Sequence, residues 1–175
     1  YKNIIKTNGK ALSMNQTTKE ILFLNPVCTH NIWGGTKLRE EFGYPIEGDD
    51  IGECWGISAH PNGDGTIRNG IYAGMKLSAV WEEHPEVFGN LDYDRFPLLT
   101  KIIDARDDLS IQVHPEDAYA KEHENGSFGK TECWYIMDAP ENATLVIGHN
   151  AKTREELSDM IRGGRWSDFI REIPV

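Results

Sequence analysis

Short apolar segments separated by turn residues dominate the pattern of hydrophobic positions along this chain of 175 residues. The segments are rich in Ile, Val, Leu, Trp and Tyr and too short for core helices, so each is predicted to be a β-strand. They are Ile21–Leu24, Glu53–Ala59, Phe96–Asp104, Leu109–His114, Glu132–Asp138 and Ala143–Gly148. Glycine and proline, 17 and 8 residues, lie scattered between them as turn formers. The pattern therefore predicts a mainly β domain.

Helix signals interrupt the strands at the periphery. Two helices have boundaries set by proline: Lys76–His84 ends before Pro85, and Glu116–Glu122 begins after Pro115. A third follows the capping-box pattern Thr153–Glu156 and ends at Gly163–Gly164. A fourth is predicted over Ser167–Glu172. An antiparallel barrel or jelly roll closes a sheet of this kind. Because the chain stops directly after the last predicted helix, we expect the barrel to be incomplete at its C-terminal end.

Composition narrows the class of partner. Lys plus Arg total 18 against 28 Asp plus Glu, so the formal net charge is −10. This balance argues against nucleic acid and against an anionic membrane surface as partners. The three cysteines, Cys28, Cys54 and Cys133, form no CxxC pair, and residues 1–14 contain no apolar stretch of signal-peptide length. We therefore expect a cytoplasmic protein, with residues 1–13 as an upstream extension or a remnant of cloning and residues 14–175 as the domain.

One predicted strand carries a polar pair among apolar neighbours. In a strand over Leu109–His114, Gln112 and His114 point to the same face, because side chains alternate. Glu132, at the start of the next predicted strand, is expected to meet them across the sheet. An imidazole, a carboxylate and an amide oxygen suit zinc. The alternative is a hydrogen-bonded strand histidine with a solvated glutamate, and spacing alone favours that alternative.

Further polar residues lie near these strands. Lys130, two residues before Glu132, is either a proton shuttle or phosphate anchor, or a solvated turn lysine. Lys101 lies in an apolar strand, so it either lines a wet cavity or pairs with a carboxylate. Glu53 heads a strand and is a candidate third carboxylate of the cavity. Trp33 is either a sugar-stacking platform or a core residue, and core packing is the commoner role.

Several motifs together resemble those of type I mannose-6-phosphate isomerases, zinc enzymes of the cupin superfamily, in their short bacterial form. They are residues 31–35 (NIWGG), 52–55 (GECW), 58–61 (SAHP), 81–88 (WEEHPEVF), 95–101 (RFPLLTK), 110–117 (SIQVHPED) and 129–135 (GKTECWY). The resemblance runs in order from about Leu22 to the end of the chain. It implies a cupin-like fold and interconversion of mannose 6-phosphate and fructose 6-phosphate through an enediol.

The resemblance also implies roles for individual residues. Gln112, His114 and Glu132 correspond to ligands of one zinc ion, and Lys130 to a catalytic lysine. The positions that line the substrate cavity are Trp33, Glu53 and Lys101. Members of the family continue into a Pro-Gly-Thr-x-His segment with a further zinc ligand, which this chain lacks. We therefore expect this chain to be the N-terminal part of the enzyme and to be inactive on its own. The alternatives are a non-catalytic sugar-binding cupin module and an interaction domain without metal; the oligomeric state stays open.

Overall fold

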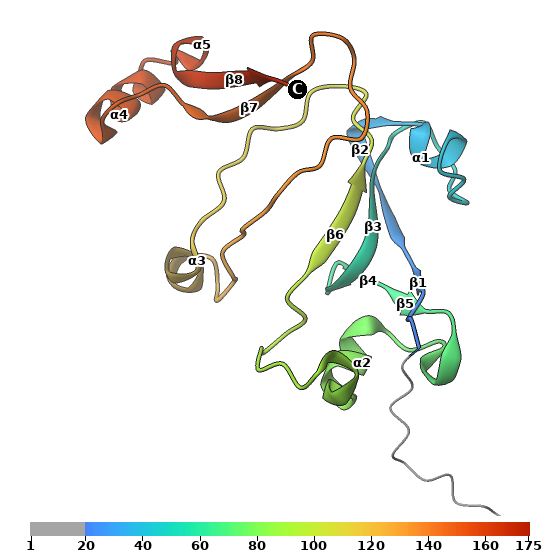
Figure 1. The fold of residues 1–175 in the computed structure, drawn as a ribbon. Helices are drawn as coiled ribbons and strands as arrows, with labels where there is room; N and C mark the ends of the chain where they lie inside the picture. Colours follow the sequence, from blue (N-terminus) through green and yellow to red (C-terminus); the bar gives the residue numbers. More distant parts are fainter. Residues whose placement is uncertain (1–19) are drawn as a thin grey trace, which may run out of the picture. The chain divides into compact units, whose positions relative to one another are not determined.

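The computed structural model describes residues 20–175, so the predicted extension over residues 1–13 lies outside the described residues. The chain groups into two compact units, of which the first ends at Leu109 and the second spans Ser110–Val175. Each unit is described by itself below, with the elements labelled as in Figure 1.

The first unit is built on an antiparallel sheet with β3 (Ile51–His60) at its centre. One edge of β3 pairs with β2 (Val27–Gly35) and the other with β6 (Leu99–Ile103), as Figure 1 shows. β4 (Gly63–Asp64) folds back on the end of β3, and β1 (Leu24–Asn25) pairs separately with β5 (Thr66–Ile67). This register places Lys101 of β6 opposite Trp55 of β3. The central strand therefore brings side chains from both halves of the unit together.

Two apolar clusters stabilise the first unit. In one, Leu38 of α1 (Lys37–Glu40) packs on Ile51 and Cys54 of β3, and all three are fully buried. In the other, Ile67 packs with Tyr72 of η1 (Gly70–Tyr72) and Val80 of α2 (Leu77–Glu83). The short helix η2 (Pro85–Phe88) follows α2 and adds partly buried side chains to this second cluster. The first cluster therefore packs on the central sheet, and the second on the pair of β1 and β5.

The second unit combines short helices with one antiparallel pair of strands, which two helices separate in the sequence. Its elements are α3 (Asp117–His123), β7 (Thr144–His149), α4 (Arg154–Arg162), α5 (Trp166–Phe169) and β8 (Ile170–Pro174), and β7 pairs antiparallel with β8. Thr153 caps α4, because its hydroxyl accepts a bond from the Glu156 amide at 3.1 Å. Between residues 20 and 175, no helix is long and apolar enough to cross a bilayer.

The predicted fold class is confirmed, since antiparallel sheets with short helices make up the described chain. The strands predicted over Glu53–Ala59, Phe96–Asp104 and Ala143–Gly148 correspond to β3, β6 and β7. The helices predicted before Pro85, after Pro115 and after Thr153 correspond to α2, α3 and α4. Of the segment Ile21–Leu24, only Leu24 enters a strand.

Two predicted strands are wrong. Residues 109–114 and 132–138 are irregular, so the expected alternation of faces at Gln112 and His114 does not hold. Ile111 and Val113, which that alternation turns into the packed interior, are 62% and 95% exposed. The physical reason is that neither segment has a hydrogen-bonded strand beside it in the described part of the chain. A β-pattern in sequence specifies a strand only where a partner strand completes the ladder.

The C-terminal prediction is also wrong. The expected helix over Ser167–Glu172 shrinks to the single turn of α5, and the chain then continues as β8. Ile170 and Ile173 of β8 pair with His149 and Leu145 of β7. The β-branched residues favour this ladder over a helix once a partner strand is available. The chain therefore ends in a strand.

Candidate active site

A backbone contact brings together the two segments that carry the predicted ligands. The Lys130 amide donates to the Pro115 carbonyl at 3.2 Å, and the Gly129 amide donates to the Asp117 carboxylate at 2.9 Å. A Cβ on Gly129 would lie 2.5 Å from the Asp117 nitrogen. Only glycine fits there, because every atom that the added carbon meets first is backbone. Helix α3 and its flanking turns thus form a closed loop with His114 at one end and Lys130 at the other.

Three polar side chains converge at the mouth of this loop. Lys130 Nζ lies 3.1 Å from His114 Nε2 and 2.9 Å from Glu132 Oε2. Glu132 Oε1 lies 3.3 Å from His114 Nε2. His114, Lys130 and Glu132 are called the His–Lys–Glu cluster below. The structure brings these three predicted residues together although neither segment is a strand.

The electrostatics of the cluster favour an ionised carboxylate. The hydrogen bond from Lys130 lowers the pKa of Glu132 most, and the charges of Lys130 and His114 and a hydrogen bond from Trp134 lower it further. Partial burial opposes these effects. At neutral pH, Glu132 is therefore an anion that can neutralise a cation beside His114.

The donor set fits part of a divalent metal site. Two ligand atoms on one tetrahedral zinc ion, each bonded at about 2.0–2.2 Å, lie about 3.3–3.6 Å apart, and Nε2 of His114 and Oε1 of Glu132, at 3.3 Å, lie at the short end of that range. The Lys130 ammonium already contacts both groups, so the pair is built to hold positive charge. Gln112 does not join them, because its amide nitrogen donates to Ser110 Oγ at 2.8 Å. Within residues 20–175, no three His, Cys, Asp or Glu side chains are grouped as metal ligands.

An open pocket lies against the cluster. It has a volume of about 260 Å³ and is lined by His114, Lys130 and the residues that flank them on both segments. The imidazole and the ammonium are therefore accessible to a small molecule. A ligand that enters there meets one potential proton donor and one potential metal ligand on the same side.

The predicted residues Glu53 and Lys101 form a second polar cluster, in the first unit. Lys101 Nζ lies 3.1 Å from both oxygens of Glu53, and its charge sits 4.6 Å from the centre of the Trp55 ring. Trp55 Nε1 donates to Glu53 Oε2 at 2.7 Å. The prediction that Lys101 pairs with a carboxylate is thus confirmed. Trp55 was not among the predicted residues, although its position two residues after Glu53 in a predicted strand placed it on the same face.

Trp33 lies apart from this cluster. A Cβ on Gly52 would come within 2.5 Å of the Trp33 ring, so the indole packs directly on the backbone of β3. Because side chains alternate along a strand, the Gly52 side of β3 is opposite the side that carries Glu53. The sugar-stacking role of Trp33 stays a prediction, and its packing in this unit matches the core alternative.

Comparisons with known proteins give the cluster a context. Residues 21–142 match the family described as phosphomannose isomerase type I, catalytic domain. The mannose-6-phosphate isomerase ManA of Bacillus subtilis is 54% identical over 158 residues, which are 90% of this chain and 50% of that protein. The mannose-6-phosphate isomerase of Streptococcus mutans is 53% identical over 156 residues, 89% of this chain and 49% of the relative.

A solved structure resembles this chain as well. The crystal structure of the mannose 6-phosphate isomerase from Bacillus subtilis matches with a TM-score of 0.85 and 54% identity, over 88% of this chain and 49% of that one. The chain therefore spans about half the length of the relatives that it matches.

Proposed function

We propose, from the premise that the chain belongs to the family of type I phosphomannose isomerase catalytic domains, that it supplies part of an active site for sugar-phosphate isomerisation. The reaction would interconvert mannose 6-phosphate and fructose 6-phosphate through an enediol. The convergence of His114, Lys130 and Glu132 within 3.3 Å of one another carries the proposal. These groups combine a metal donor pair with a mobile proton source, the two requirements of this chemistry.

The residues of the cluster would act as follows. His114 and Glu132, with Gln112 as a third candidate, would hold one zinc ion, which would polarise the oxygens of the sugar. Lys130 lies beside both groups, so its neutral amine would take the proton from one carbon, and the ammonium that forms would return it to the neighbouring carbon. The substrate phosphate needs a local positive group because the chain as a whole is acidic.

We also propose substrate-binding roles for residues of the first unit. Glu53 and Lys101 form an ion pair that can present a carboxylate and an ammonium to sugar hydroxyls, and the Trp33 indole would contact the sugar separately, on the other side of β3. We also propose a cytoplasmic location. Its support is that Cys28 and Cys54 face each other across β2 and β3 as free thiols, which is typical of a reducing compartment.

The test compares this chain with a fusion in which Val175 continues into the C-terminal half of Bacillus subtilis ManA. Metal content is measured by elemental analysis and turnover by a coupled isomerase assay. We expect no turnover from the 175-residue chain, and zinc-dependent turnover from the fusion. In the fusion, His114→Asn and Glu132→Gln should remove bound zinc and activity together, whereas Lys130→Met should remove activity and retain zinc.

Matched controls lie on α3. Lys121→Met and Glu122→Gln remove one charge each from exposed positions of that helix and should change neither zinc content nor rate. Zinc-free turnover by the fusion would overturn the proposal. Retained zinc without turnover would favour the alternative of a non-catalytic sugar-binding module.

A further inference from the structure

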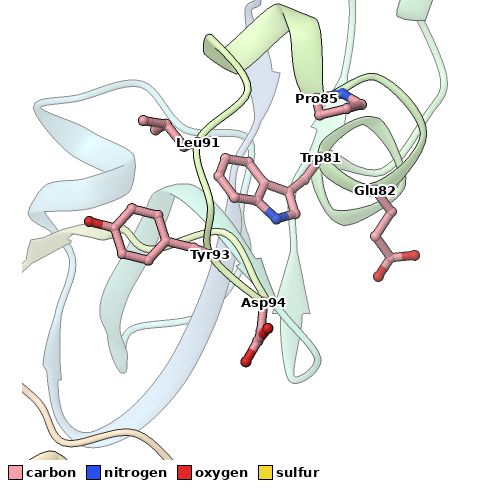
Figure 2. Close-up of a pocket in the computed structure, with 6 residues that line it drawn as sticks. All are labelled: Trp81, Glu82, Pro85, Leu91, Tyr93 and Asp94. Carbon is pink, nitrogen blue, oxygen red and sulfur yellow. The ribbon is translucent and has the colours of Figure 1, made fainter.

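A second pocket lies in the first unit and shares no residue with the His–Lys–Glu cluster. Its volume is about 240 Å³, and its walls come from the end of α2 and from the irregular chain after η2. Figure 2 shows the lining side chains: Trp81, Glu82, Pro85, Leu91, Tyr93 and Asp94. This volume suits a ligand of one ring rather than a larger cofactor.

The indole of Trp81 points an unused donor at this pocket. The side chain is only 8% exposed, and its ring packs on Phe88 and Phe96 at centroid distances of 5.1 and 5.4 Å. Across residues 20–175, its N–H donates to no acceptor, and the nitrogen is not sealed from solvent. Figure 2 shows the nitrogen turned to the side on which the carboxylates of Glu82 and Asp94 lie. A buried indole N–H normally finds a partner, so this one is available to a ligand.

The carboxylates of Glu82 and Asp94 are available acceptors. Both side chains are exposed, and in the described part of the chain neither makes a hydrogen bond or an ion pair. Tyr93 and Leu91, 61% and 53% exposed, add an aromatic and an aliphatic wall. The pocket therefore offers one donor, two anionic acceptors and an apolar surface.

We propose that this pocket binds one neutral sugar ring, independently of the proposed isomerase site. A hydroxyl group both accepts and donates, so neighbouring hydroxyls can accept from Trp81 and donate to Glu82 and Asp94. The C–H face of the ring would lie on Tyr93. An anion such as a sugar phosphate is repelled by the two carboxylates, and an ammonium or guanidinium ion has no acceptor for the indole N–H.

The test follows the five tryptophan indole signals of the ¹⁵N-labelled 175-residue chain by NMR, with Trp81→Phe to assign that of Trp81. The probe is methyl α-D-mannopyranoside, whose blocked anomeric carbon prevents isomerisation. We expect a saturable shift of the Trp81 signal and no shift of the other four. Asp94→Asn and Glu82→Gln should each weaken binding about tenfold, the loss expected when a hydrogen bond to a charged group becomes neutral. Glu83→Gln, which changes the next exposed carboxylate of α2, is the matched control.

Three results would overturn the proposal. The first is a Trp81 signal that stays fixed up to the solubility limit of the glycoside. The second is a shift of that signal by methylguanidinium with higher affinity than by the glycoside. The third is equal weakening by Glu83→Gln and Asp94→Asn. Loss of isomerase activity in the fusion protein has no bearing on these outcomes, because none of the pocket residues belongs to the His–Lys–Glu cluster. The two proposals can therefore fail separately.

Discussion

Replacing Lys101 by methionine tests the cluster that it forms with Glu53 and Trp55. The substitution keeps the length of the side chain and removes its charge. It leaves the Glu53 carboxylate, of which only 15% is exposed, with the Trp55 N–H as its remaining partner. A carboxylate in that position has lost most of its water without keeping its counter-charge, so the folded state should be destabilised.

The expected magnitude follows from the burial of the pair. Removing one partner of a fully buried ion pair costs about 3–5 kcal/mol, whereas an exposed pair contributes about 0–1 kcal/mol. The Lys101 and Glu53 side chains are 23% and 15% exposed, so the cost lies between these limits. We expect Lys101→Met to lower the free energy of unfolding by about 2 kcal/mol, of which the lost cation–π contact with Trp55 supplies about 1 kcal/mol.

The assay is urea unfolding followed by circular dichroism, applied as a double-mutant cycle with Glu53→Gln. The amide of glutamine still accepts from Trp55 and needs no counter-charge. The double variant should therefore recover part of the loss, with a coupling of about 1 kcal/mol or more. Lys121→Met, at an exposed lysine, should leave the midpoint unchanged. Strictly additive losses from the two single variants would refute the reasoning.

Three further perturbations test other parts of the structure. Gly129→Ala should force the two segments of the His–Lys–Glu cluster apart, and hydrogen exchange of the Lys130 amide should speed up by at least about fivefold, since its bond costs about 1 kcal/mol or more to lose. Burial, with a hydrogen bond and charge interaction from the neighbouring Cys54 thiol, raises the pKa of Cys28 to about 12. Its thiolate is then about one part in 10,000 at pH 8, so iodoacetamide should modify the exposed Cys133 first, as peptide mass spectrometry can show. A hydrogen bond from His30 lowers the pKa of Asp50. The stability that this bond gives is present at neutral pH and is lost as the pH falls through the lowered pKa. In His30→Ala, the pKa of Asp50 measured by NMR titration of its carboxyl group should rise.

The sequence allowed prediction of those elements whose partners are local or strongly patterned. The central strand β3 combines β-branched and aromatic residues, and α4 carries its own cap, so both appear where the pattern predicted them. The strand β2 was missed because glycine, asparagine and histidine dilute its apolar pattern. It forms because β3 lies beside it and completes its backbone hydrogen bonds, and the sequence of β2 alone does not specify that partner.

The candidate site was predicted by chemistry more than by geometry. His114, Lys130 and Glu132 come together, yet the cause is a turn closed through Gly129 and not the predicted pairing of two strands. The pairing of Lys101 with a carboxylate followed from the cost of leaving a lysine in an apolar strand without a partner. Trp81 gave no comparable signal, because the freedom of its N–H depends on packing that the sequence does not specify.

The irregular segments on either side of α3 have a practical consequence for handling the protein. Val113 and Tyr135 are 95% and 89% exposed, and the backbone of residues 110–114 and 131–137 makes no hydrogen bond to another backbone group within residues 20–175. Extended apolar chain with free amides templates intermolecular sheets. Concentrated solutions of this chain should aggregate through these segments. The substitution Val113→Lys should reduce this aggregation, because a charged side chain opposes the pairing of exposed strands.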